Sequence, residues 1–305
     1  MSSGALGRKI KTALGETRLL ILGAQILFGF HFNAAFQDGF PGLALPSRYL
    51  HTLAFFAMAC TIGCLIAPSM QHRLVERGHA TTRMLRVTTR FAAAALVLFA
   101  LALGMDLYIV VEHRFGLFWG LLIGIGLGTM ALLFWYGAEW MLRPSGRKED
   151  KMPSQEDTPL EARVEQMLTE ARVLIPGAQA LFGFQLGVML MDAFGQLPAT
   201  AKAVHTAALC CIVIAIILLM APAAFHRVTF GGQDTEEFYR LGSRLVVAGA
   251  VPLAAGIAAD LDVAIQSSLG SQPIAMAVAI VVGLVLAGLW FIYPLVLRAK
   301  LARTR

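Results

Sequence analysis

Long apolar stretches, separated by short polar segments, dominate this chain. A transmembrane helix needs roughly 20 mostly apolar residues, and eight stretches meet that need. The pattern predicts an all-α, polytopic membrane protein with eight transmembrane helices. The predicted spans cover residues 19–37, 50–70, 91–111, 117–141, 173–191, 204–225, 245–266 and 274–297.

The second half of the chain repeats the first. The segment Glu16–Phe30 reappears as Glu170–Phe184, a shift of 154 residues that continues without a gap through three spans. After one inserted residue the match resumes in the fourth span. A duplication of this length predicts two four-helix repeats. The repeats cover residues 19–143 and 173–298, with a basic segment at 1–18, a linker at 144–172 and a basic tail at 299–305.

Positive charge alternates along the predicted topology. The segments 1–18, 71–90, 142–172, 226–244 and 298–305, on one side of the predicted spans, hold 22 of the 25 Lys and Arg residues, so these parts are predicted to be cytoplasmic. Because each repeat has an even number of spans, the repeats should be parallel and related by a pseudo-twofold axis along the membrane normal. The net charge of +6 is explained by this topology and by attraction to anionic lipids, without nucleic acid. A homo-oligomer of the fused unit is compatible with this arrangement.

Composition supports the membrane assignment and restricts the chemistry. Apolar residues make up 57% of the chain and charged residues 14%, with a mean hydropathy of +0.69. The four cysteines lie in apolar stretches without disulfide or metal spacing. No nucleotide loop, catalytic triad or zinc motif is present, so a conventional enzyme site is not expected. Within the linker, Leu160–Leu168 is amphipathic and is expected to lie along the membrane surface.

Acidic residues and histidines that both repeats share are the first candidate site. Asp106 lies about 24 Å along the third span from Arg90, which places it inside the outer part of the membrane. An ionisable residue there is a functional candidate, and a neighbouring histidine allows proton exchange near neutral pH. Structural hydrogen bonds are the alternative explanation. The ion or proton site candidates are Asp106, Asp260, Asp38, Asp192, His51 and His205.

Shared basic residues on the cytoplasmic side form a second group. Arginine side chains suit phosphate or carboxylate, so an anion, a lipid headgroup or a haem propionate is one candidate ligand. Topology anchoring with Glu–Arg pairing is the alternative. The residues concerned are Arg73, Arg227, Arg86, Arg240, Arg90 and Arg244. His72 and His226 follow a proline near the end of the second span, where they either cap the helix or meet across the axis as haem ligands.

Other intraspan residues are assigned to packing. Gln25 and Gln179 are amides inside the first span of each repeat, and each is expected to find an interhelical hydrogen bond or to contact a ligand. Gly120, Gly124 and Gly128 recur at helical spacing in the fourth span. Small residues at this spacing favour close helix packing, and a glycine-lined permeation path is the alternative.

The motifs together resemble a known family. The pattern Glu-x-Arg-x-Leu-x-x-Gly-x-Gln-x-Leu-Phe-Gly-Phe, followed by Ala-Pro-x-x-x-His-Arg, is similar to that of uncharacterised bacterial four-helix membrane proteins, here in tandem. Some members carry the label sodium:proton antiporter. The resemblance implies an integral protein of the bacterial cytoplasmic membrane. The repeats differ at His31, where the second repeat has Gln185, and at Gln71, where it has Phe225.

Three functions are therefore open. The first is ion or small-solute transport, proton-coupled through Asp106 and Asp260. The second is a structural, lipid-binding or accessory role without a cofactor. The third is electron transfer by a b-type haem held by the histidines.

Overall fold

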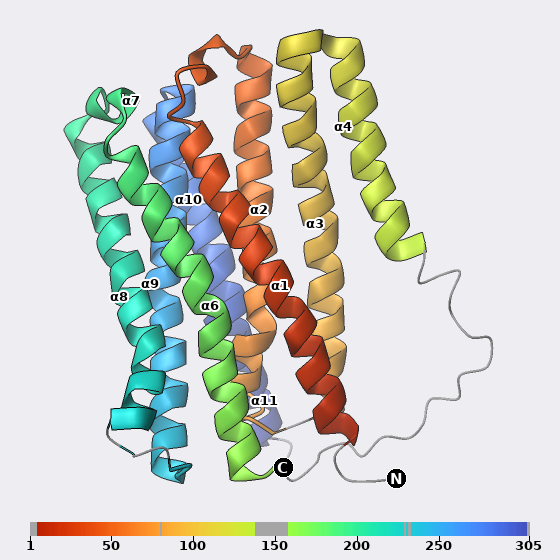
Figure 1. The fold of residues 1–305 in the computed structure, drawn as a ribbon, viewed down its shortest axis with the longest axis vertical. Helices are drawn as coiled ribbons and strands as arrows, with labels where there is room; N and C mark the ends of the chain where they lie inside the picture. The colour runs from red at the N-terminus through yellow and green to blue at the C-terminus, as the bar shows by residue number, and fades with distance from the viewer. Residues whose placement is uncertain (1–4, 80, 138–157, 229, 231–232, 304–305) are drawn as a thin grey trace.

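The computed structural model describes residues 5–79, 81–137, 158–228, 230 and 233–303, so residues 144–157 of the predicted linker lie outside it. The described residues form helices and no β-strand. Figure 1 shows long helices lying side by side, with both termini at the same end of the bundle. The all-α prediction is confirmed for this part of the chain.

Every predicted span coincides with a helix. The long helices are α1 (Ala5–Ala34), α2 (Leu45–Leu74), α3 (Thr82–Phe115), α4 (Leu117–Leu132), α6 (Leu160–Val188), α8 (Ala199–Val228), α9 (Glu236–Leu269), α10 (Gln272–Ala287) and α11 (Tyr293–Arg303). Short elements are η1 (Phe40–Gly42), η2 (Leu133–Gly137), α7 (Asp192–Gly195) and η3 (Gly288–Ile292).

Part of this set has the length and apolar composition of membrane-spanning helices. Five helical segments in the described chain are long and apolar enough to cross a membrane: Leu45–Leu74, Thr82–Phe115, Ala199–His226, Glu236–Leu269 and Gln272–Ala302. Shorter apolar stretches occur at Leu20–Ala34 in α1 and Leu117–Leu132 in α4. The number of eight spans therefore stays a prediction.

The two repeats begin and end their third helix in the same way. Thr81 caps α3 by accepting a hydrogen bond from the backbone of Met84, and its equivalent Thr235 caps α9 in the same manner. Both helices have 34 residues and end at a glycine with positive φ, 89° at Gly116 and 64° at Gly270. Glycine adopts this conformation without strain, so the duplicated sequence fixes both helix ends.

The inserted residue of the second repeat lies at the turn after α9. Gly116 leads directly into α4, whereas Gly270 is followed by Ser271 before α10 begins. Beyond the turn the repeats come back into step, because the π-helical segments η2 and η3 follow α4 and α10 at matching positions. The insertion is thus absorbed without disturbing the helices on either side.

The first helices of the two repeats, α1 and α6, pack against each other in the middle of the bundle (Figure 1). The equivalent rings of Phe30 and Phe184 meet there, with centroids 4.9 Å apart. A Cβ atom on Gly29 would lie 2.1 Å from the Phe184 ring, so this contact requires a glycine. In the equivalent position, a Cβ atom on Gly183 would meet nothing within 4 Å. The α1–α6 contact is therefore not formed by equivalent faces of the two helices.

The fourth helices show a larger departure from symmetry. Helix α10 packs on α9 and also on α2 of the first repeat, where the indole of Trp290 donates a hydrogen bond to the carbonyl of Gly63 at 2.9 Å. Trp290 is fully buried. Its equivalent, Trp135, is half-buried and packs on Phe99 of its own repeat. Exact twofold symmetry is therefore not observed in the side-chain packing.

The segment Leu160–Leu168 differs from its expected position on the membrane surface. It forms the first part of α6, and its side chains Val164 and Met167 are buried in the core. A Cβ atom on Gly242 of α9 would lie 2.5 Å from the Met167 methyl group, which shows how closely this part of α6 is packed. The apolar face that sequence assigned to lipid is covered by protein.

Close packing explains the glycines of α4. Added Cβ atoms at Gly120 and Gly124 would lie 2.7 Å from Glu112 and from the carbonyl oxygen of Gly104, both on α3. Gly126, on another face, would meet nothing within 4 Å. The packing interpretation is therefore confirmed for Gly120 and Gly124.

Candidate functional site

His31 and Asp106 form an ion pair in the first repeat. The imidazole Nε2 of His31, on α1, lies 2.9 Å from a carboxylate oxygen of Asp106, on α3. The His31 side chain is only 4% exposed, whereas that of Asp106 is 30% exposed. The pair lies toward the end of the bundle opposite the termini, because α1 runs from its N-terminal end to the α1–α2 connection there (Figure 1).

The contacts of His31 fix the roles of its two ring nitrogens. Its Nδ1 lies 2.8 Å from the carbonyl oxygen of Leu27. Because a carbonyl oxygen only accepts hydrogen bonds, Nδ1 is the donor in this contact. Nε2 faces the Asp106 oxygen at 2.9 Å, but the angle of this contact is outside hydrogen-bond geometry. The contact is favourable when the pair binds one further proton, since two acceptors would repel each other.

A cavity of about 390 Å³, here called the His31 cavity, opens beside this pair. It is bounded by α1, α2, α3 and the η1 turn. Most of its wall is apolar, and the polar side chains in it are Gln37, Asp106 and three histidines. Residues that line it include Phe30, His31, Phe40, His51, Asp106 and His113.

His51 is the second buried histidine of this cavity. Its ring centroid lies 5.5 Å from that of His31 and 4.9 Å from that of Phe40. The residue is 7% exposed, and its Nε2 has no hydrogen-bond partner among the described residues. A buried polar atom of this kind needs water or a ligand. The structure therefore brings the predicted residues His51 and Asp106 to one cavity.

The second repeat has a different pair at the equivalent position. The side-chain amide of Gln185, on α6, donates to both carboxylate oxygens of Asp260, on α9, at 2.8 and 3.0 Å. Asp260 is 1% exposed and Gln185 is fully buried. The amide carries its own hydrogen atoms, so this contact needs no shared proton. His205 completes the group, with its Nε2 3.1 Å from the backbone carbonyl of Gln185.

The other acidic candidates lie elsewhere. Asp38 and Asp192 are both exposed, in the connection after α1 and in α7. Asp38 does not line the His31 cavity, although its neighbours Gln37 and Gly39 do. Sequence reasoning grouped Asp38 with Asp106 and assigned no role to His31 or His113. The available signal was the difference between His31 and Gln185.

A second buried cluster joins the two repeats near the termini. Glu170 of α6 accepts from Arg73 of α2, with Nε and Oε2 2.5 Å apart, and its other oxygen lies 2.9 Å from Nδ1 of His72. All three residues are at least nine-tenths buried. Arg73 also donates to Tyr239 and Ser243 at 3.4 and 3.5 Å. The Glu–Arg pairing expected from the sequence is confirmed for Arg73, with its partner in the other repeat.

The other basic residues predicted to bind an anion form no comparable cluster in the described part of the chain. Arg86, Arg90, Arg240 and Arg244 are exposed, and Arg240 pairs with Glu236 within α9 at 3.3 Å. The side chain of Arg227 lies outside the described residues. Their binding of anions, lipid headgroups or propionates stays a prediction.

His226 contacts Asp234 at 3.1 Å, whereas the equivalent His72 contacts Glu170. The two histidines therefore each face a carboxylate, and haem ligation stays a prediction. No group of three or more metal-ligating side chains occurs among the described residues.

The two glutamines that were predicted to lie inside the membrane differ in burial. Gln25 is fully buried between α1 and α6, where a Cβ atom on Gly177 would lie 1.6 Å from its amide oxygen. Neither polar atom of the Gln25 amide has a hydrogen-bond partner in the described structure. Gln179, its equivalent, is exposed. The predicted interhelical hydrogen bond is thus absent for Gln25, whose amide instead packs against a glycine.

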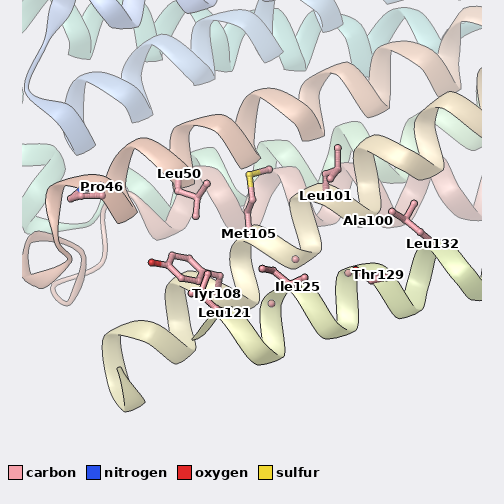
Figure 2. A pocket seen from close by; sticks show the side chains of 13 residues that line it. Pro46, Leu50, Ala100, Leu101, Met105, Tyr108, Leu121, Ile125, Thr129 and Leu132 are labelled. Atoms are coloured by element: carbon pink, nitrogen blue, oxygen red, sulfur yellow. The ribbon is translucent and has the colours of Figure 1, made fainter. Parts of the chain in front are cut away.

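An apolar cavity of about 510 Å³ lies between α2, α3 and α4 (Figure 2). Leu50, Met105, Leu121 and Ile125 line it, and Tyr108 and Thr129 supply its polar side chains. It contains no ionisable group other than the Tyr108 phenol. This cavity has the character of a lipid-facing groove and does not share residues with the His31 cavity.

Comparison with known proteins agrees with the internal repeat. Residues 2–139 and residues 155–294 each match a family of unknown function, DUF6328. The protein belongs to this family. The two DUF6328 units correspond to the two repeats, which confirms the tandem duplication and the resemblance to an uncharacterised family. No curated protein and no solved structure matches the chain.

Proposed function

We propose that this tandem DUF6328 protein is a proton-coupled membrane transporter in which His31 and Asp106 form the proton-binding site. The observation that carries the proposal is the 2.9 Å contact between His31 Nε2 and Asp106, which is favourable when the pair binds a proton. An ionisable pair within a predicted span is costly to keep unless it has a function. A histidine paired with a carboxylate also suits proton exchange near neutral pH.

The cavity supports a transport role for this pair. Asp106 is partly exposed and lines the His31 cavity together with His51 and His113. A proton leaving His31 has these two imidazoles as neighbouring acceptors. Under the predicted topology, the cavity lies toward the outer face of the membrane, so the pair would load and unload its proton there.

The two repeats have different roles in this proposal. Asp260 is 1% exposed and is held by the Gln185 amide. With an amide in place of the imidazole, the second repeat lacks the proton acceptor that His31 provides. The second repeat would then serve as the fixed half, and the first as the proton-binding half.

Proton uptake by proteoliposomes tests the proposal. The purified full chain is reconstituted, an acid pulse outside supplies a pH gradient, valinomycin with equal potassium on both sides clamps the voltage, and an internal pH dye reports uptake. Asp106→Asn should reduce uptake at least tenfold, because the pair then lacks its carboxylate. Asp260→Asn is the matched control and should retain most of the uptake.

Uptake by Asp106→Asn at the wild-type rate would overturn the proposal. Equal losses in Asp106→Asn and Asp260→Asn, with both variants reconstituted in similar amounts, would instead remove the assignment of the proton site to the first repeat.

A further inference from the structure

The His31 cavity has the size and walls of a small-molecule site. Ligand cavities commonly have volumes of about 300–1,000 Å³ and are mostly apolar with a few polar groups, and this cavity has about 390 Å³. Phe30 and Phe40 present aromatic rings to it, and Leu27, Leu43 and Ile109 complete an apolar wall. Such walls favour a ligand that is itself largely hydrophobic.

The ionisable side chains of the cavity favour one sign of charge on that ligand. Asp106 is the only acidic residue that lines it, and the facing titratable groups are His31, His51 and His113. Under the proposed function, the proton of the His31–Asp106 pair compensates the Asp106 carboxylate. A ligand that brings its own positive charge, close to aromatic rings, would replace that compensation.

We propose that the His31 cavity binds a small lipophilic organic monocation, whose charge pairs with Asp106 while the shared proton is released. This inference rests on the proposed function, for which it names the substrate class. The exchange balances in charge: one cation enters, one proton leaves, and His31 becomes neutral. Exchange of the cation against a proton requires that one carboxylate binds the cation and releases the proton.

A hard metal ion fits the cavity less well. Such ions take several oxygen ligands, whereas the lining side chains provide oxygen atoms only at Gln37 and Asp106. The carbonyl of Leu27, a further oxygen, already accepts from His31. A bare ion would lose more hydration than these groups replace.

Isothermal titration calorimetry of the full chain in lipid nanodiscs tests the inference, with empty nanodiscs subtracted. Benzyltrimethylammonium is the probe, and neopentylbenzene is its neutral isostere, with carbon in place of nitrogen. The cation should bind at least tenfold more tightly than the isostere. Titrations in two buffers of different ionisation enthalpy should report about one proton released per cation.

Variants locate the site. Asp106→Asn should weaken cation binding at least tenfold, and Asp192→Asn, at an exposed acid of the second repeat, should leave it unchanged. Ala34→Phe places a ring in the cavity wall and should also abolish binding, so the test does not depend on the Asp106 variant being folded. Binding that survives both Asp106→Asn and Ala34→Phe would overturn the inference.

The outcomes separate this inference from the proposed function. Cation binding with proton release, in a protein that takes up no protons even when the liposomes are loaded with the cation, would support the site and reject transport. Proton flux without cation binding would support transport and overturn the substrate class. Tight binding of phenylacetate in place of the cation would also overturn it, because the histidines would then form an anion site.

Discussion

His31 and Gln185 occupy the same position in the two repeats, and each contacts the aspartate on the third helix of its own repeat. The backbone arrangement is thus retained while the chemistry changes. An imidazole faces Asp106, whereas an amide donates its own hydrogen atoms to Asp260. Under the proposed function, this single difference separates a site that exchanges protons from one that only holds two helices together.

The first prediction concerns His31→Gln, which gives the first repeat the residue of the second. We expect the free energy of unfolding to change by less than about 1 kcal/mol, because the amide replaces one hydrogen bond to a carboxylate by another. Thermal unfolding in detergent measures it. His31→Leu is the comparison and should be clearly less stable, since it leaves the Asp106 carboxylate without a donor.

The second prediction concerns Gln185→Leu. Asp260 is 1% exposed, and its two oxygens accept only from Gln185 among the hydrogen bonds described. Loss of that donor should destabilise the protein by about 1–3 kcal/mol. Gln179→Leu is the control, because Gln179 is exposed, and it should have little effect. Equal melting temperatures for the two variants would contradict the role of Gln185.

The third prediction tests the contact between the repeats. Glu170→Ala removes the carboxylate that Arg73 and His72 share and leaves a buried guanidinium without its ion pair. Breaking a buried pair from one side costs about 3–5 kcal/mol. Arg240→Ala removes an exposed guanidinium from its surface pair with Glu236 and should cost less than about 1 kcal/mol. Chemical unfolding of both variants in mixed micelles compares them, and similar costs would be inconsistent with a buried cluster.

The fourth prediction uses two glycines of one helix. A Cβ atom on Gly124 would lie 2.7 Å from the backbone oxygen of Gly104, whereas one on Gly126 would meet nothing within 4 Å. Gly124→Ala should therefore destabilise the α3–α4 contact by about 1–3 kcal/mol. Gly126→Ala should be neutral or slightly stabilising, because alanine favours helix. A greater loss of stability in Gly126→Ala than in Gly124→Ala would show that the packing between α3 and α4 is wrongly assigned.

Much of the fold was predictable because it depends on local patterns. Apolar stretches of span length predicted where the long helices lie. The 154-residue repeat explains why α3 and α9 share their caps: Thr81 and Thr235 at the start, and Gly116 and Gly270 at the end. Caps and turns depend on a few neighbouring residues, so copies of a sequence repeat them.

Contacts between helices were less predictable because they depend on how each helix is rotated. Sequence placed Asp106 correctly on the third helix but did not place His31 against it. It also expected Glu–Arg pairing without assigning Arg73 to Glu170, 97 residues away. The buried amide of Gln25 shows the same limit, since it packs against Gly177 on α6.

Proton uptake into proteoliposomes containing His31→Gln tests the central claim most directly. This variant keeps a donor to Asp106 and removes only the group that shares the proton. We predict a stable protein whose proton uptake falls to that of empty liposomes, while Gln185→His retains uptake. Uptake by His31→Gln at the wild-type rate would contradict the claim that His31 and Asp106 form the proton-binding site.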